Sequence, residues 1–238
     1  MFSDNVAVSK PYIIAFLGTV GSGKSTQMKL LYSKLKWKGL KVKMSFLKIG
    51  HLFAFIFEIF LAKIVAGKRR DVFPIRALVE ERPRLFKRLF RLWLGLDLIS
   101  ITIKFLACIY APLRLGYTVL VEEYIPATIS DYIYLSKIIN FPLKIRSFAI
   151  NYLLKLMSLK PTQIIFLDAE NDKLAYRWKL RGSFDEKEDY LRMQRTILLK
   201  VSKRLSHKFL YIDTGAKTIK ETHKLVINCL LLFEDKSY

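Results

Sequence analysis

Short apolar runs alternate with stretches of helical spacing along most of the chain. The first run, residues 12–17 (YIIAFL), has no charged position, which is typical of a strand buried on both faces of a parallel sheet. Similar runs predict strands over 41–46, 117–122, 163–168 and 209–213. Helical spacing predicts helices over 24–38, across 126–158 with a break at Pro142, and over 170–180, 185–204 and 217–234. This alternation predicts an α/β fold whose parallel sheet is covered on both faces.

The region between the second and third predicted strands, about residues 50–115, is largely helical and apolar. Its two apolar stretches, 52–67 and 89–113, both contain internal charges: Glu58, Lys63, Arg91, Asp97 and Lys104. A membrane span needs about 20 residues with few charges. We therefore interpret these stretches as buried or half-buried helices, and contact with a membrane surface stays open as an alternative.

The chain shows no sign of export or of a second domain. Residues 1–12 lack the pattern of a signal peptide, and the two cysteines have no partner spacing. No stretch rich in Pro, Gly or Ser separates one part of the sequence from another. We expect one cytoplasmic domain over residues 1–238, in which 50–115 is a helical insertion or acceptor-binding region.

The chain is strongly basic, with 41 Lys and Arg residues against 20 Asp and Glu residues and a net charge of +21. Such an excess favours polyanionic partners: nucleic acid, an anionic membrane surface, or phosphorylated small molecules. No recognition motif for nucleic acid accompanies the charge, so it indicates the class of partner only weakly.

The segment 16–26 (FLGTVGSGKST) carries the most specific chemistry in the sequence. Gly18, Gly23, Lys24 and Ser25 satisfy the pattern G-x-x-x-x-G-K-[ST], between a predicted strand and a predicted helix. Glycines let backbone N–H groups turn toward a phosphate, the lysine reaches the terminal phosphates, and the serine hydroxyl binds Mg²⁺. The pattern predicts binding of ATP and Mg²⁺ by the loop residues Gly18, Thr19, Val20, Gly21, Ser22, Gly23, Lys24, Ser25 and Thr26.

Three acidic residues stand at or near the ends of predicted strands: Glu122, Asp168 and Asp213. Ligands bind at the carboxyl ends of strands in such sheets, so we expect these carboxylates to share the edge on which the loop lies. A carboxylate there can hold Mg²⁺ or orient the acceptor. Asp168 has the alternative of capping the next helix.

Four segments resemble the thymidylate kinase branch of the nucleoside monophosphate kinases in order and spacing. They are GTVGSGKSTQMKLL (18–31), GYTVLVEEY (116–124), KPTQIIFLDAENDKLAYRWKLRG (160–182) and YIDTGAKTIKETHKLV (211–226). The resemblance covers both ends of the chain well and residues 45–112 poorly. It implies a P-loop NTPase three-layer sandwich in which helices flank a five-stranded parallel sheet of order 2-3-1-4-5.

The resemblance also implies roles for particular residues. Residues 177–190 match the arginine-rich lid, whose Arg177 and Arg181 share one helix face and would stabilise the transferring phosphate. Glu122 matches the acid of the Asp-Arg-aromatic motif, as a catalytic residue and a metal ligand with Ser25. The backbone of the turn that contains Gly215 would pack the adenine ring. A homodimer is a further expectation, because the family is commonly dimeric.

Departures from the family pattern are concentrated on the acceptor side. Val20 stands where thymidylate kinases often have an acid, and Glu123 replaces the arginine of the Asp-Arg-aromatic motif. The Arg-Glu-Pro-Gly motif after the second strand is absent. We therefore predict Mg-ATP-dependent phosphoryl transfer to a nucleotide or nucleoside, with dTMP as the default acceptor. The alternative is a nucleotide-binding protein with little kinase activity that docks a partner, nucleic acid or an anionic membrane.

Overall fold

The computed structural model describes residues 12–65, 74–144, 147–180 and 188–234, with only the backbone for 64–65, 76–77, 80 and 229–234. Its five strands form one parallel sheet of order β2-β3-β1-β4-β5, which confirms the predicted fold class and strand order. The strands are β1 (Ile13–Gly18), β2 (Val42–Leu47), β3 (Thr118–Glu123), β4 (Thr162–Asp168) and β5 (Lys208–Asp213).

Helices connect the strands in the predicted alternation. They are α1 (Lys24–Trp37), α2 (Leu52–Val65), α3 (Pro74–Glu81), α4 (Pro83–Phe105), the π-helical turn η1 (Leu106–Tyr110), α5 (Ala111–Arg114), α6 (Ile125–Ile138), α7 (Phe148–Met157), α8 (Asn171–Leu180), α9 (Glu188–Leu205) and α10 (Ile219–Glu234). The stretch expected as one interrupted helix over 126–158 is two helices, α6 and α7, and Pro142 lies in their connection.

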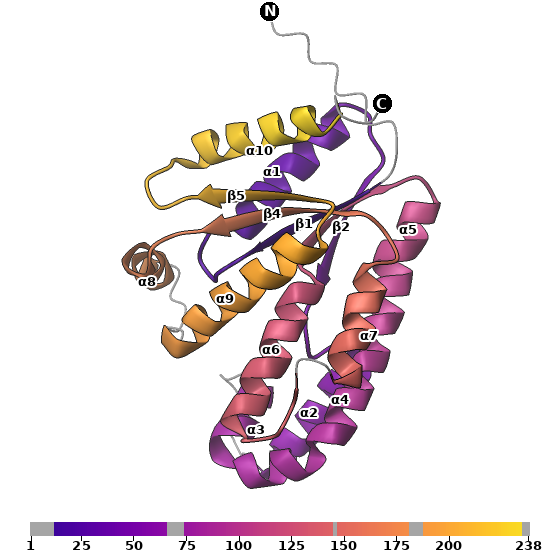
Figure 1. Cartoon of the computed structure of the whole chain (residues 1–238), viewed down its shortest axis with the longest axis vertical. Coiled ribbons are helices and arrows are strands. Elements are labelled where there is room, and N and C mark those ends of the chain that lie inside the picture. The colour runs from indigo at the N-terminus through magenta and orange to yellow at the C-terminus, as the bar shows by residue number, and fades with distance from the viewer. Residues whose placement is uncertain (1–11, 66–73, 145–146, 181–187, 235–238) are drawn as a thin grey trace, which may run out of the picture.

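The sheet is covered on both faces because successive side chains of each strand point to opposite sides. On one face, Ile14 and Phe16 of β1 pack with Leu31 of α1 and Val226 of α10. On the other face, alternate strand positions such as Ala15 join a larger core that includes α6 and α9. Figure 1 shows α1 and α10 on one side of the sheet and α9 and α6 on the other. These two layers leave the carboxyl ends of the strands free to carry a site.

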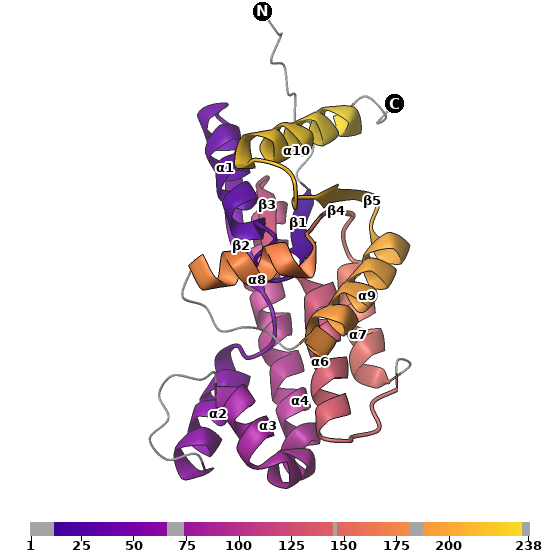
Figure 2. The same cartoon turned by 90° about the vertical axis from the view of Figure 1, so that its left-hand side faces the viewer.

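Residues 52–65 and 74–114 form helices, of which α2, α3 and α4 extend to the end of the molecule far from the sheet (Figures 1 and 2). Within the described part of the chain, one continuous helical stretch, Pro83–Arg114, is long and apolar enough to cross a membrane by length and composition. Its residues Phe86, Phe90, Trp93 and Phe105 are fully or almost fully buried in the larger core. One face of α4 therefore packs inside the protein, as the half-buried interpretation predicts.

A buried polar cluster fixes the connection between β2 and α2. The Asp97 carboxylate accepts hydrogen bonds from the Gly50 backbone N–H (2.9 Å) and from the Tyr132 hydroxyl (2.7 Å). The Glu58 carboxylate accepts one from the Trp93 indole N–H (2.8 Å).

Candidate functional site

The glycine-rich loop, residues 18–26, packs directly against two other elements. A Cβ at Gly18 would lie 1.8 Å from the Leu167 carbonyl oxygen of β4, and one at Gly21 would lie 2.7 Å from the Trp178 indole nitrogen of α8. Both glycines also have positive φ angles, 139° and 86°. Only glycine meets both requirements, so Gly18 and Gly21 let the loop lie close to the sheet and to α8.

Lys24 lies at the centre of the loop and is almost fully buried. Its ammonium group donates hydrogen bonds to the carbonyl oxygens of Gly18 (3.0 Å) and Thr19 (2.9 Å). It also forms an ion pair with Glu123, with 3.2 Å between Nζ and Oε1. An ammonium group has three N–H donors, so these three acceptors occupy all of them.

Ser25 and Glu122, the two predicted metal ligands, are brought together at the start of α1. The Ser25 hydroxyl donates a hydrogen bond to the Glu122 carboxylate, at 2.5 Å. Both residues line a cavity of about 130 Å³, together with Val20, Gly21, Gly23, Lys24, Thr26 and Glu123. The structure thus places predicted binding and catalytic residues from two distant segments around one small polar space.

This oxygen donor set fits Mg²⁺. No group of three His, Cys, Asp or Glu side chains that could hold a metal ion occurs within the described ranges. Magnesium is usually bound by one or two side chains together with water and the phosphates of the substrate. One hydroxyl and one carboxylate beside the loop therefore suit a metal that arrives with the nucleotide.

Asp168 ties the loop to α9 rather than capping the next helix. It accepts a hydrogen bond from the Thr19 hydroxyl (3.0 Å) and forms an ion pair with Arg195, at 2.7 Å between Nε and Oδ2. Arg195 also donates to the Ala169 carbonyl oxygen. Arg195 carries no local signal in the sequence, because an arginine in the middle of an amphipathic helix resembles an ordinary surface residue.

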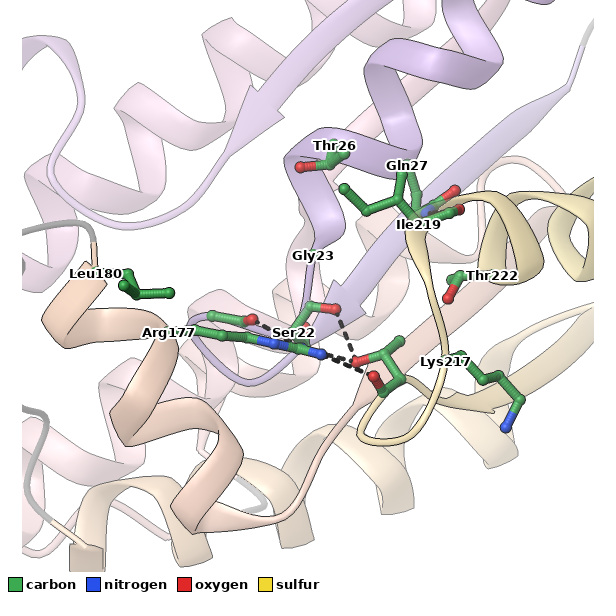
Figure 3. Close-up of a pocket in the computed structure, with 11 residues that line it drawn as sticks. Ser22, Gly23, Thr26, Gln27, Arg177, Leu180, Lys217, Ile219 and Thr222 are labelled. Carbon is green, nitrogen blue, oxygen red and sulfur yellow. Dashed lines mark hydrogen bonds between the residues drawn. The ribbon is translucent and has the colours of Figure 1, made fainter.

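Arg177 joins the loop to the turn after β5. Its guanidinium group donates to the Gly21 carbonyl (3.3 Å), to the Thr214 hydroxyl (3.0 Å) and to the Thr214 carbonyl (2.7 Å). Figure 3 shows this side chain reaching from α8 across the loop. It lies at a second cavity, so its predicted contact with the transferring phosphate stays a prediction.

The second cavity has a volume of about 250 Å³. It adjoins the small one through shared residues of the loop. Its lining residues are Gly21, Ser22, Gly23, Thr26, Gln27, Arg177, Leu180, Thr214, Lys217, Ile219 and Thr222. Gly215 is not among them, although its neighbours Thr214 and Lys217 are, and its N–H bonds the Asp213 carboxylate (2.8 Å). Thr214 and Lys217 of this turn line the cavity, and the packing of an adenine ring against the turn stays a prediction.

Arg181, the other predicted lid arginine, and residues 181–187 of the predicted lid lie outside the described residues. On either side of this segment, α8 ends at Leu180 and α9 begins at Glu188. The roles of Arg181 and of the lid stay predictions.

Arg177 lends itself to a direct test. We expect Arg177→Ala to weaken the binding of a fluorescent ATP analogue about tenfold. The substitution removes the hydrogen bonds that connect the loop to the turn after β5, and it removes a side chain that lines the larger cavity. Arg204→Ala, which removes an exposed arginine at the end of α9, is the matched control. Equal affinities for the two variants in a fluorescence titration would contradict this role for Arg177.

Solved structures similar to this chain include two thymidylate kinases. The Candida albicans enzyme superposes with a TM-score of 0.59 at 18% identity, over 94% of this chain and 93% of its own. The Ehrlichia chaffeensis enzyme superposes with a TM-score of 0.56 at 19% identity, over 93% of this chain and 99% of its own. No protein-family model and no curated protein matches the sequence. The chain therefore has the P-loop NTPase fold of the thymidylate kinases, as its sequence resemblance implies.

Proposed function

We propose that this chain transfers the terminal phosphoryl group of ATP to a nucleotide or nucleoside, with Mg²⁺ as the metal, in the cytoplasm. One observation carries the proposal: a small polar cavity with Lys24, Ser25 and Glu122 adjoins a larger cavity of about 250 Å³ through the glycine-rich loop. The larger volume is somewhat below the usual range for small-molecule sites, which suits a ligand that is only partly enclosed. A nucleotide needs such a pair of sites, one for its phosphates and one for its base.

The residues of the small cavity have clear chemical roles in this proposal. Lys24 and the first N–H groups of α1, which have no acceptor inside the helix, bind the terminal phosphates. Ser25 and Glu122 hold Mg²⁺, which neutralises charge on the phosphates when it is bound. Arg181 stabilises the charge that develops during transfer. Catalysis of this reaction consists mainly of such positioning and charge stabilisation.

The proposal is tested by incubating the purified chain with Mg-ATP and a panel of nucleosides and nucleotides that includes dTMP. We expect ADP to form in response to at least one acceptor, and omission of Mg²⁺ or addition of EDTA to stop it. ADP formation that no acceptor stimulates would contradict the proposal.

A second candidate function is a nucleotide-binding protein that docks an anionic membrane. The observation in its favour is the outer surface of α2 and α4, where large apolar side chains are exposed, among them Phe53, Ile56, Leu92 and Ile99. The net charge of +21 would favour anionic lipid. A second copy of the chain or a nucleic acid is the competing partner.

Flotation with liposomes distinguishes these partners. The membrane candidate predicts that the chain floats with anionic vesicles, that high salt weakens this binding, and that Ile56→Glu abolishes it. If the chain instead stays at the bottom of the gradient and sediments as a dimer, a homodimer covers this surface. A salt-dependent mobility shift of DNA without flotation would point to nucleic acid.

A further inference from the structure

Arg195 connects the middle of α9 to the end of β4 and the start of α8, although it is not among the residues that line the two cavities. Its guanidinium group donates to both Asp168 carboxylate oxygens, from Nε to Oδ2 at 2.7 Å and from Nη2 to Oδ1 at 3.2 Å. Nη2 also donates to the Ala169 carbonyl oxygen (3.0 Å) and to the Asn171 side-chain oxygen (3.2 Å). This planar set of donors holds the Asp168 carboxylate in one orientation.

The side chain of Asp168 extends this contact to the glycine-rich loop. Its Oδ1 accepts a hydrogen bond from the Thr19 hydroxyl (3.0 Å), and Thr19 is fully buried. The Thr19 carbonyl oxygen in turn accepts a hydrogen bond from the Lys24 ammonium group (2.9 Å). A continuous series of contacts therefore leads from Arg195 to the lysine of the loop.

The backbone of Asp168 makes the corresponding contact with the turn after β5. Its carbonyl oxygen accepts hydrogen bonds from the Thr214 N–H (2.8 Å) and from the Thr214 hydroxyl (2.9 Å). Thr214 lines the larger cavity and accepts two hydrogen bonds from Arg177. Asp168 is thus bonded both to the loop beside the small cavity and to a wall of the larger one.

The relative position of these two parts matters because a nucleotide in the proposed site spans both. The loop would bind its phosphates, and the turn after β5 would lie beside its base. A site that is already held in its bound geometry loses less free energy to ordering when the ligand binds. Asp168 can hold the loop at a fixed distance from the turn only while its side chain keeps one orientation, and Arg195 provides that constraint.

We propose that Arg195 is a positioning residue for the nucleotide: through Asp168 it holds the glycine-rich loop and the turn after β5 at the separation that one nucleotide spans. The inference rests on the nucleotide site of the proposed function, and it adds to that site a residue that lies outside both cavities. Loss of Arg195 frees the Asp168 carboxylate, so that Thr19 and the loop can shift relative to the turn.

The experiment measures, by calorimetry in the presence of Mg²⁺, the affinity of the full chain for a non-hydrolysable ATP analogue. We expect Arg195→Ala to weaken binding about tenfold, because neighbouring residues in one hydrogen-bond network commonly couple by about this much. Arg195→Lys keeps the positive charge but not the planar set of donors, so it should restore part of the affinity. Arg192→Ala removes an exposed arginine of the same helix, and this control should match the wild type.

A double-mutant cycle tests whether Arg195 acts through Asp168 on the loop. Thr19→Val removes the hydroxyl group that bonds Asp168, and it should weaken binding of the analogue about fivefold. In Arg195→Ala/Thr19→Val the loss of affinity should be clearly smaller than the product of the two single losses, because both substitutions interrupt the same series of contacts. A loss equal to that product would contradict action through this route.

Loss of stability is separated from loss of positioning by two further measurements. Denaturant unfolding shows which variants are folded at the assay temperature, and if Arg195→Ala is not, Arg195→Lys and Thr19→Val carry the test. In the ADP assay, the variants should raise the KM for ATP as much as they weaken binding. The kcat at saturating ATP should stay within about threefold of the wild-type value, because the lost interaction serves binding and not the transfer step.

The outcomes distinguish this inference from the proposed function. If the chain binds the analogue and Arg195→Ala binds it as tightly as Arg192→Ala does, the inference is wrong and the kinase proposal stands. If the Arg195 variants lose affinity as expected but no acceptor yields ADP, the inference is supported and the kinase proposal fails. If the wild-type chain does not bind the analogue, both are overturned.

Discussion

Lys24→Ala is expected to reduce acceptor-dependent ADP formation at least about 100- to 1,000-fold, as does removal of one charge-stabilising donor in other enzymes. Lys24 is the one loop side chain whose charged group is held by the Gly18 and Thr19 carbonyls at the centre of the site. The measurement is a coupled ADP assay with the best acceptor found, together with a titration of a fluorescent ATP analogue. A variant that keeps a tenth or more of the wild-type rate would contradict the assigned role.

The same substitution should also affect stability, which needs a control. Removing Lys24 leaves the buried Glu123 carboxylate without its 3.2 Å partner, and a buried charge that loses its partner typically costs about 3–5 kcal/mol. In the double variant Lys24→Ala/Glu123→Gln the unpaired charge is gone, so most of the stability should return. We expect this double variant to be folded and still unable to bind the ATP analogue, whereas Glu123→Gln alone binds it. Recovery of binding in the double variant would show that loss of stability, not loss of the ammonium group, explains the single variant.

The second large effect concerns the pH dependence of stability, which we expect to arise in the cluster around Asp97. Burial, more than any neighbour, raises the pKa of Asp97 from 3.8 to about 7 and that of Glu58 from 4.5 to about 7. Between about pH 4 and pH 7 the folded chain therefore binds more protons at these groups than the unfolded chain. Their contribution to the free energy of unfolding is fully present below pH 4 and is lost as the pH rises toward 7.

Asp97→Asn tests this directly, because the amide has the same size and no charge to titrate. The wild type should lose on the order of 3 kcal/mol per group between pH 4.5 and pH 7.5, and the variant should lose about half as much in total. Denaturant unfolding at several pH values measures both. The pKa of His51, lowered to about 4 by burial and then by Lys104, acts in the opposite direction in both proteins and cancels in the difference. Identical pH profiles for the wild type and Asp97→Asn would contradict the assignment, and Glu81→Gln serves as an exposed control.

Local patterns were sufficient to predict the strands and helices, whereas the strand order came from the resemblance to the thymidylate kinases. Continuous apolar runs marked strands buried on both faces, and the spacing of apolar residues marked α1 and α10. The loop residues could be named from the sequence because their chemistry depends on a contiguous turn, in which Gly18, Gly23 and Lys24 have fixed positions relative to one another. Glu122 could be named as well, because a strand end is a local feature that parallel topology places at a known edge.

Other parts of the site depend on contacts between distant segments, and these contacts cannot be predicted from local sequence patterns. Arg195 meets Asp168 across 27 residues, and Arg177 meets Thr214 across 37. In the sequence, Glu58 and Asp97 are charged positions that interrupt apolar helices. In the fold, Glu58 accepts a hydrogen bond from Trp93, and Asp97 accepts hydrogen bonds from Tyr132 and from the Gly50 N–H. These pairings arise only when the helices pack.

The sequence by itself determined that a glycine-rich loop of the pattern G-x-x-x-x-G-K-[ST] lies between β1 and α1 of a parallel α/β sheet, because residues near one another in the chain carry that information. It also showed that the acceptor side departs from the thymidylate kinase pattern, at Val20 and Glu123. Only the tertiary structure decided where the Glu123 carboxylate lies. The fold buries this carboxylate beside Lys24, because the strained turn at the end of β3 and the packing of Tyr124 direct it toward the small cavity beside the loop.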